Sequence, residues 1–125
     1  QSLACFKNIN IRKNVKDIAK HMHSADMVFS SAGRTVYELA IVGTPSIVLA
    51  QNERELTHFF ASEDHGFENL GLGAELAESE ICDAFTSIAR NYSKRLEMHR
   101  RLAKQDVLGG KRRVIKIING LIEAQ

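Results

Sequence analysis

Two short apolar runs, at residues 26–30 and 46–50, lie on either side of a segment with helical spacing. Each run has the length and composition of a buried strand. The segment 34–42 between them is expected to form a helix that ends at Gly43, with Pro45 just beyond it. Buried strands joined by a helical crossover run parallel, so the sequence predicts an α/β fold with a parallel sheet flanked by helices.

The rest of the chain continues the alternation between short apolar runs and helical patterns. Toward the amino end we expect an extended piece at Ile9 and Ile11, followed by a helix with Val15, Ile18, Ala19 and Met22 on its apolar side. After residue 50 we expect a helix over 53–64 and a loop with a short strand over 66–73. A helix capped by Ser79 would then bury Ile81, Phe85, Ile88 and Ala89.

Two further helices are expected at the carboxyl end, separated by Gly109 and Gly110. The first would be lined by Leu96, His99, Leu102 and Ala103, and the second by Val114, Ile117, Ile118, Leu121 and Ile122.

Length and composition predict a single soluble domain over residues 1–125. Apolar residues make up 44% of the chain and charged residues 26%, and no apolar run approaches the length of a membrane span. The first residues lack the pattern of a secretion signal, which favours a cytoplasmic location. Cys5 and Cys82 have no metal-ligand spacing and are expected to be reduced, partly buried thiols.

Charge and histidine placement argue against two other classes of function. The net charge is +2, with acids concentrated at 53–83 and bases at 94–116, which is the pattern of solvated helix faces. The basic segment lacks interleaved aromatic residues, so no nucleic-acid partner is expected. His21 and His23 would face different directions on a helix, so no metal site is expected.

The turn after the first strand carries the strongest functional signal. Ser31, Ala32 and Gly33 allow a ligand to approach the backbone, and the following helix would point free N–H groups outward. A diphosphate fits there, and Glu38, one turn into the helix, would accept hydrogen bonds from both ribose hydroxyls. The alternative is a capping box, in which Thr35 and Glu38 only satisfy the first N–H groups of the helix.

A second loop, from Gln51 to His58, follows the second strand. Ligand loops of parallel sheets lie at the carboxyl ends of the strands, so both loops are expected to meet at one crevice. A histidine at position 58 would donate to phosphate or sugar, or pack as an ordinary helix residue. Gln51 and Asn52 would contact the ligand or only form a turn.

The run from Ala25 to Ala40, with Gly43-Thr44-Pro45-Ser46-Ile47-Val48-Leu49 after it, resembles the carboxyl-terminal half of GT-B nucleotide-sugar enzymes. Similar proteins include MurG-like glycosyltransferases, PseG-type UDP-sugar hydrolases and SpsG-like proteins of spore-coat polysaccharide synthesis. The run Gln51-Asn52-Glu53-Arg54-Glu55 favours the last two groups. A weaker likeness continues through Asp106 to Val114 and resembles a closing D-G-x-G-x-x-R stretch.

The resemblance implies a Rossmann-like half that binds a UDP-linked nucleotide sugar as substrate, without a cofactor. Gly33, Arg34 and Thr35, with Ala32 before them, would hold the diphosphate, and Glu38 the ribose. Thr57 and His58 stand where MurG-like proteins carry paired glutamines that touch the sugar or phosphates.

The same resemblance implies that the catalytic base lies elsewhere. No opening glycine-rich loop is found before Phe6, and the acceptor-binding amino-terminal half, which would be the partner of this one, is not found either. The piece alone would then bind the leaving nucleotide and stabilise its charge without turnover.

Other interpretations are a UDP-sugar hydrolase half, an interaction domain that kept only the fold, and a flavodoxin-like or response-regulator-like domain. Asp26 precedes its strand instead of ending it, which counts against the last of these.

Overall fold

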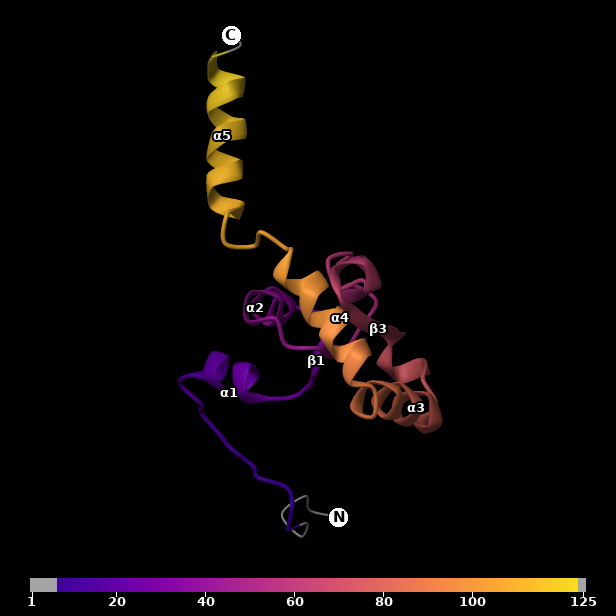
Figure 1. Ribbon diagram of the computed structural model, residues 1–125. Helices are drawn as coiled ribbons and strands as arrows, with labels where there is room; N and C mark the ends of the chain where they lie inside the picture. Colours follow the sequence, from indigo (N-terminus) through magenta and orange to yellow (C-terminus); the bar gives the residue numbers. More distant parts are fainter. Residues whose placement is uncertain (1–6, 124–125) are drawn as a thin grey trace.

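The computed structural model describes residues 7–123 and has three parallel strands with helices on both sides of the sheet (Figure 1). The strands are β1 (Val28–Ser31), β2 (Ser46–Ala50) and β3 (Phe67–Leu72), in the order β1-β2-β3. The helices are α1 (Ile18–Ser24), α2 (Thr35–Val42), α3 (Glu78–Ala89), α4 (Tyr92–Ala103) and α5 (Gly110–Glu123). This arrangement confirms the predicted α/β class and is consistent with a Rossmann-like fold.

The central strand β2 separates two apolar clusters. Val48 and Ala50 belong to the larger one with Leu39, Phe67 and Leu102, whereas Ile47 points to the opposite face. There it packs with Ala84 and Ile88 of α3 and with Met98 of α4. Neighbouring strand residues face opposite sides, so both faces of β2 are covered, as parallel sheets require.

The strand–helix–strand unit of residues 28–50 forms as predicted. Gly43 ends α2 in the left-handed conformation, with φ +72°, and its N–H donates to the Leu39 carbonyl at 2.9 Å. Val28 pairs with Ser46 and Ser31 with Leu49, so the two strands end at the same edge of the sheet. The loops that follow β1 and β2 therefore lie at one edge.

Helix α4 lies at the other end of the strands. His99 Nδ1 donates to the Gly43 carbonyl at 2.7 Å, and the Met98 carbonyl lies directly against Gly66, which precedes β3. Both contacts fall on segments that lead into strands, so α4 covers their amino ends.

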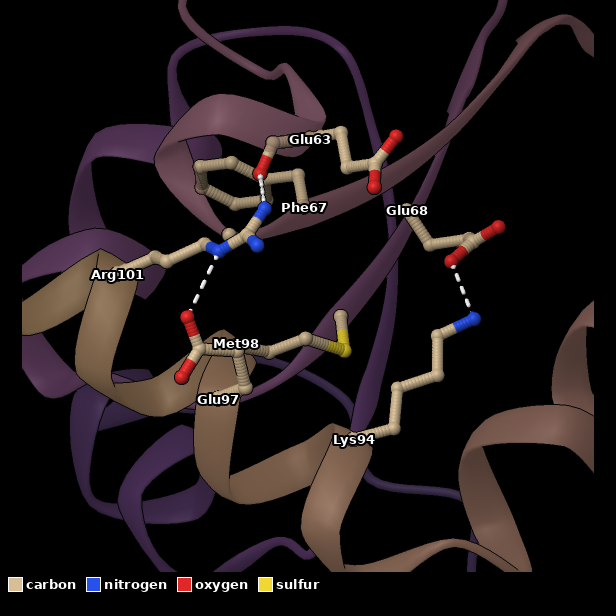
Figure 2. A pocket seen from close by; sticks show the side chains of 8 residues that line it. Glu63, Phe67, Glu68, Lys94, Glu97, Met98 and Arg101 are labelled. Carbon is tan, nitrogen blue, oxygen red and sulfur yellow. Dashed lines mark hydrogen bonds and ion pairs between the residues drawn. The ribbon is translucent and has the colours of Figure 1, made fainter.

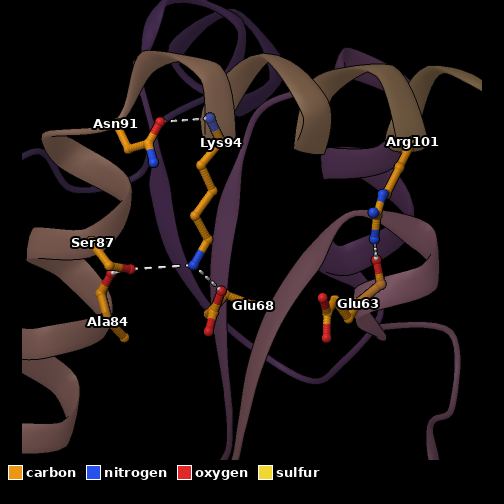
Figure 3. Close-up of polar contacts among 7 residues, drawn as sticks. All are labelled: Glu63, Glu68, Ala84, Ser87, Asn91, Lys94 and Arg101. Carbon is orange, nitrogen blue, oxygen red and sulfur yellow. Dashed lines mark hydrogen bonds and ion pairs between the residues drawn. The ribbon is translucent and has the colours of Figure 1, made fainter.

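The groove beside α4 is occupied by ion pairs (Figures 2 and 3). Lys94 Nζ lies 2.8 Å from the Glu68 carboxylate and 3.2 Å from Ser87 Oγ, and Arg101 Nε lies 3.1 Å from Glu97. The basic side chains of the groove thus have acidic partners, and none of the predicted ligand residues lines it.

The predicted helix over 53–64 is wrong. The segment holds two 3₁₀ turns, η2 (Glu55–Thr57) and η3 (Glu63–His65), and a third, η4 (Gly73–Glu75), follows β3. Asn52 Oδ1 accepts from the Glu55 N–H at 3.2 Å, and the Thr57 hydroxyl donates to the Arg54 carbonyl at 2.7 Å. Side chains that bond the local backbone compete with helix formation in this way.

Helix α5 forms in the predicted region after Gly109, but none of its residues is buried. Val114, Ile117, Ile118, Leu121 and Ile122 are between 50% and 67% exposed. Figure 1 shows the helix extending away from the sheet after the turn at Leu108–Gly109. Its apolar stripe contacts no other element among residues 7–123 closely enough to be buried.

Smaller predictions are corrected in the same way. Helix α3 begins at Glu78, after Ala77, whose N–H donates to Glu80 at 2.8 Å, so Ser79 is not the cap. Phe85 is exposed and stacks on Phe29. Ala89 and Ala103 are also exposed, and Met98 is buried on α4.

The prediction that Cys82 is partly buried is wrong, because this residue is exposed. Cys5 and the start of the chain before Phe6 lie outside the described residues.

Candidate functional site

The turn between β1 and α2 holds backbone donors that have no acceptor within residues 7–123. Within residues 7–123, the N–H groups of Gly33, Arg34 and Thr35 donate no hydrogen bond. The first bonds of the helix start later, from Val36 to the Gly33 carbonyl at 3.3 Å and from Tyr37 to the Arg34 carbonyl at 3.1 Å. Three unpaired N–H groups at the positive end of a helix can bind an anion.

The capping-box alternative for Thr35 and Glu38 is wrong. Arg34 occupies the cap position with helical backbone angles, φ −64° and ψ −22°, and no side chain caps the helix. Thr35 is the first residue of α2, so it lies inside the helix and not before it. Glu38 is exposed and has no hydrogen bond or ion pair within residues 7–123, which leaves both carboxylate oxygens accessible.

His58 joins the second loop to the first. Its Nδ1 lies 2.9 Å from the carbonyl oxygen of Ala32, a buried residue of the first turn. A carbonyl only accepts, so Nδ1 carries a proton and donates it to Ala32. The two predicted loops therefore meet, and His58 positions the turn through Ala32.

Glu55 also reaches the first turn, and sequence reasoning assigned it no role. Its Oε2 accepts from the Gln51 N–H at 2.9 Å. Its Oε1 lies 3.5 Å from the place that a Cβ on Gly33 would occupy, and Ser31 Oγ lies 3.4 Å from that place. The signal that could have found it is its position in the second loop, at 3₁₀ spacing from Asn52.

The remaining residues of the second loop divide into two groups. Asn52 and Thr57 use their side chains on the loop's own backbone, which is the turn-forming interpretation of Asn52. Gln51, in contrast, lines an open hollow of about 320 Å³ at the carboxyl ends of β1 and β2, together with Ser30 and Ser31. The structure thus gathers residues 31–35 and 51–58 at one edge of the sheet.

No cluster of three or more potential metal-ligating side chains occurs among the described residues. No helix of the described part is long and apolar enough to cross a membrane. The chemistry this edge supports is the binding of an anion by backbone donors, with an exposed carboxylate nearby to accept hydroxyl groups.

The chain is an α/β protein with a Rossmann-like arrangement, and comparison with known proteins finds distant relatives. It is 28% identical over 89 residues to the spore coat polysaccharide biosynthesis protein SpsG of Bacillus subtilis, which covers 70% of this chain and 26% of SpsG. It is 31% identical over 99 residues to the uncharacterised protein MJ1062 of Methanocaldococcus jannaschii, covering 64% of this chain and 20% of that protein. The chain thus spans about a quarter or less of the curated relatives it matches.

No protein-family model matches the chain, and no solved structure is significantly similar to it. The likeness to SpsG is distant, and the name of that protein assigns SpsG itself to spore coat polysaccharide biosynthesis.

Proposed function

We propose that this chain is a nucleotide-sugar-binding domain, residues 1–125, of a glycosyltransferase-like enzyme of polysaccharide biosynthesis. In this proposal it corresponds to the carboxyl-terminal half of a GT-B enzyme, resembling SpsG, PseG and MurG-like proteins. The observation that carries it is the set of unpaired N–H groups at Gly33, Arg34 and Thr35 beside the unpaired carboxylate of Glu38. The likeness to SpsG supports the same assignment.

The diphosphate of a nucleotide sugar would accept hydrogen bonds from these three N–H groups. Ribose hydroxyls would donate to Glu38, one turn into α2. Gln51 lines the hollow where the sugar would lie, and His58 holds Ala32 in place. Charge that develops on the leaving diphosphate is stabilised by fixed dipoles, which is the electrostatic part of glycosyl transfer. UDP-linked sugars are the substrate class that the resemblance favours.

The partner half of the same enzyme would bring the acceptor and the catalytic base. The attacking group, a sugar hydroxyl in a transferase or water in a PseG-type hydrolase, would then come from that half. An interaction domain that has kept only the fold is the competing proposal, and it predicts that no nucleotide binds.

The test is an NMR titration of this domain with UDP, CMP, GDP and ADP. We expect selective shifts of the amides of residues 32–36 with UDP, and at least a tenfold loss of affinity in Glu38→Ala, because the ribose loses its acceptor. The control is Asp83→Ala, which removes an exposed carboxylate from α3, far along the chain from the site.

Glu38 caps nothing in the structure, so its removal should change the free energy of unfolding by less than about 0.5 kcal/mol. If Glu38→Ala binds UDP as tightly as the wild type, the Glu38 carboxylate does not contact the ribose. Absence of shifts with every nucleotide at millimolar concentration would favour the interaction domain.

A further inference from the structure

A second cavity lies on the exposed side of α2, between that helix and the segment that joins α4 to α5. Its volume is about 360 Å³, which is in the size range of small-molecule sites. Tyr37 and Phe60 form one side, and Gln105, Asp106 and Arg113 line the other. None of these residues belongs to the diphosphate site described above.

The aromatic side of the cavity packs against the core, and part of it is exposed. The rings of Tyr37 and Phe60 lie 4.6 Å apart between centroids, with 33° between their planes. Phe60 is held in turn by His65 at 4.9 Å and by the fully buried Phe67 at 6.0 Å. Tyr37 itself is 43% exposed, so part of its ring is free to contact a ligand.

The polar side is held by its own hydrogen bonds. Arg113 pairs with the Asp106 carboxylate and donates to the Asp106 carbonyl at 2.6 Å. The Gln105 side-chain amide donates to the Arg101 carbonyl at 3.1 Å, which leaves its Oε1 without a donor within residues 7–123. A fixed acceptor and a fixed guanidinium therefore face an aromatic wall across a small cavity.

The cavity is next to the diphosphate site along α2. Tyr37 follows Thr35 by two residues and directly precedes Glu38, and both Tyr37 and Glu38 are exposed. Side chains of a helix tilt toward its amino end, so the Tyr37 ring leans toward the turn with the free N–H groups. A ligand whose phosphates lie at that turn and whose ribose lies at Glu38 would reach this side of α2.

We propose that this cavity binds the nucleobase of the nucleotide. The inference rests on the proposed function and adds the base subsite to it. The base stacks on the exposed face of Tyr37, and polar atoms on its edge bond to Gln105 Oε1 and the Arg113 guanidinium. Stacking on aromatic side chains suits any base, whereas the polar side discriminates among bases.

The test compares UDP with inorganic pyrophosphate as ligands of Tyr37→Leu. Loss of the ring should weaken UDP binding about tenfold or more, since stacking contributes about 1–3 kcal/mol per base, and should leave pyrophosphate binding unchanged. Tyr37→Phe should restore UDP affinity. Tyr92→Leu is the matched control, because Tyr92 is 69% exposed on α4 and lines neither site.

The outcomes separate this inference from the proposed function. Three results would each overturn the base subsite. In Tyr37→Leu, these are an equal loss of affinity for UDP and pyrophosphate, or an unchanged affinity for UDP. In the wild type, it is an affinity for UDP no higher than that for pyrophosphate. Binding of neither ligand to the wild type would overturn the diphosphate site itself. In the wild type, saturation transfer from the Tyr37 ring to protons of the UDP base provides an independent readout.

Discussion

Two carboxylates near the first turn differ in what surrounds them. Glu55 accepts a hydrogen bond from the Gln51 N–H and lies against Gly33, so it helps to shape the second loop. Glu38 has no partner within residues 7–123 and faces solvent. A carboxylate with two free oxygens can accept both hydroxyls of a ribose, so Glu38 is the better candidate for ligand contact.

Thr44 offers a stability prediction at the same scale. This residue is 4% exposed, and its hydroxyl donates to the Met22 carbonyl at 2.8 Å, which ties α1 to the segment before β2. Thr44→Val removes the donor but keeps the shape, so the free energy of unfolding should fall by about 1–2 kcal/mol in urea denaturation. Thr86→Val, at an exposed position of α3, should cost less than about 0.5 kcal/mol. Equal losses in the two variants would mean that the Thr44 bond adds nothing.

At the scale of elements, the loop into β3 depends on a glycine. Gly66 has φ +100°, and a Cβ there would lie 2.5 Å from the Met98 carbonyl oxygen of α4. Gly120, in α5, has open space around it. Gly66→Ala should lower the free energy of unfolding by more than about 1 kcal/mol, because it strains the backbone and pushes α4 away.

Gly120→Ala is the matched change and should raise the helicity of α5, since alanine is favoured over glycine in a helix by about 1 kcal/mol. Circular dichroism at 222 nm and thermal melting would measure both effects. A Gly66→Ala variant as stable as the wild type would show that α4 is not held against this loop.

The elements around the site differ in how far local pattern specified them. The unit from β1 to β2 follows from apolar runs of strand length and from Gly43 and Pro45, which are local signals. Residues 53–64 have a helical composition, yet Asn52 and Thr57 bond the backbone and the segment turns back toward Ala32. That contact joins residues 26 positions apart, so no local pattern records it.

For the whole molecule, the sheet and α1–α4 form a packed body, whereas α5 adds an amphipathic helix outside it. Ile88 of α3 is fully buried, and Ile118 of α5 is 50% exposed. Ile88→Ala should therefore destabilise the body by about 2–5 kcal/mol, as large-to-small core substitutions do. The identical substitution Ile118→Ala should change the unfolding of the body by less than about 0.5 kcal/mol.

Urea denaturation followed by tyrosine fluorescence would compare the two isoleucine variants. A loss in Ile118→Ala as large as that in Ile88→Ala would mean that α5 packs against the body in solution. Amphipathic spacing predicted which side of α5 is apolar, but it does not show what covers that side, and no residue of the helix is buried among the described residues.

The sequence by itself determined the α/β class, the strand–helix–strand unit of residues 28–50 and the position of the turn at Ala32–Thr35. These depend on residue periodicity and on glycine and proline, which act within a few positions. Only the tertiary structure decided that His58 and Glu55 approach this turn, that Thr35 and Glu38 form no capping box, and that Tyr37 and Phe60 face Arg113 across a cavity. Such contacts join distant segments, and packing of the whole chain, not local preference, sets them.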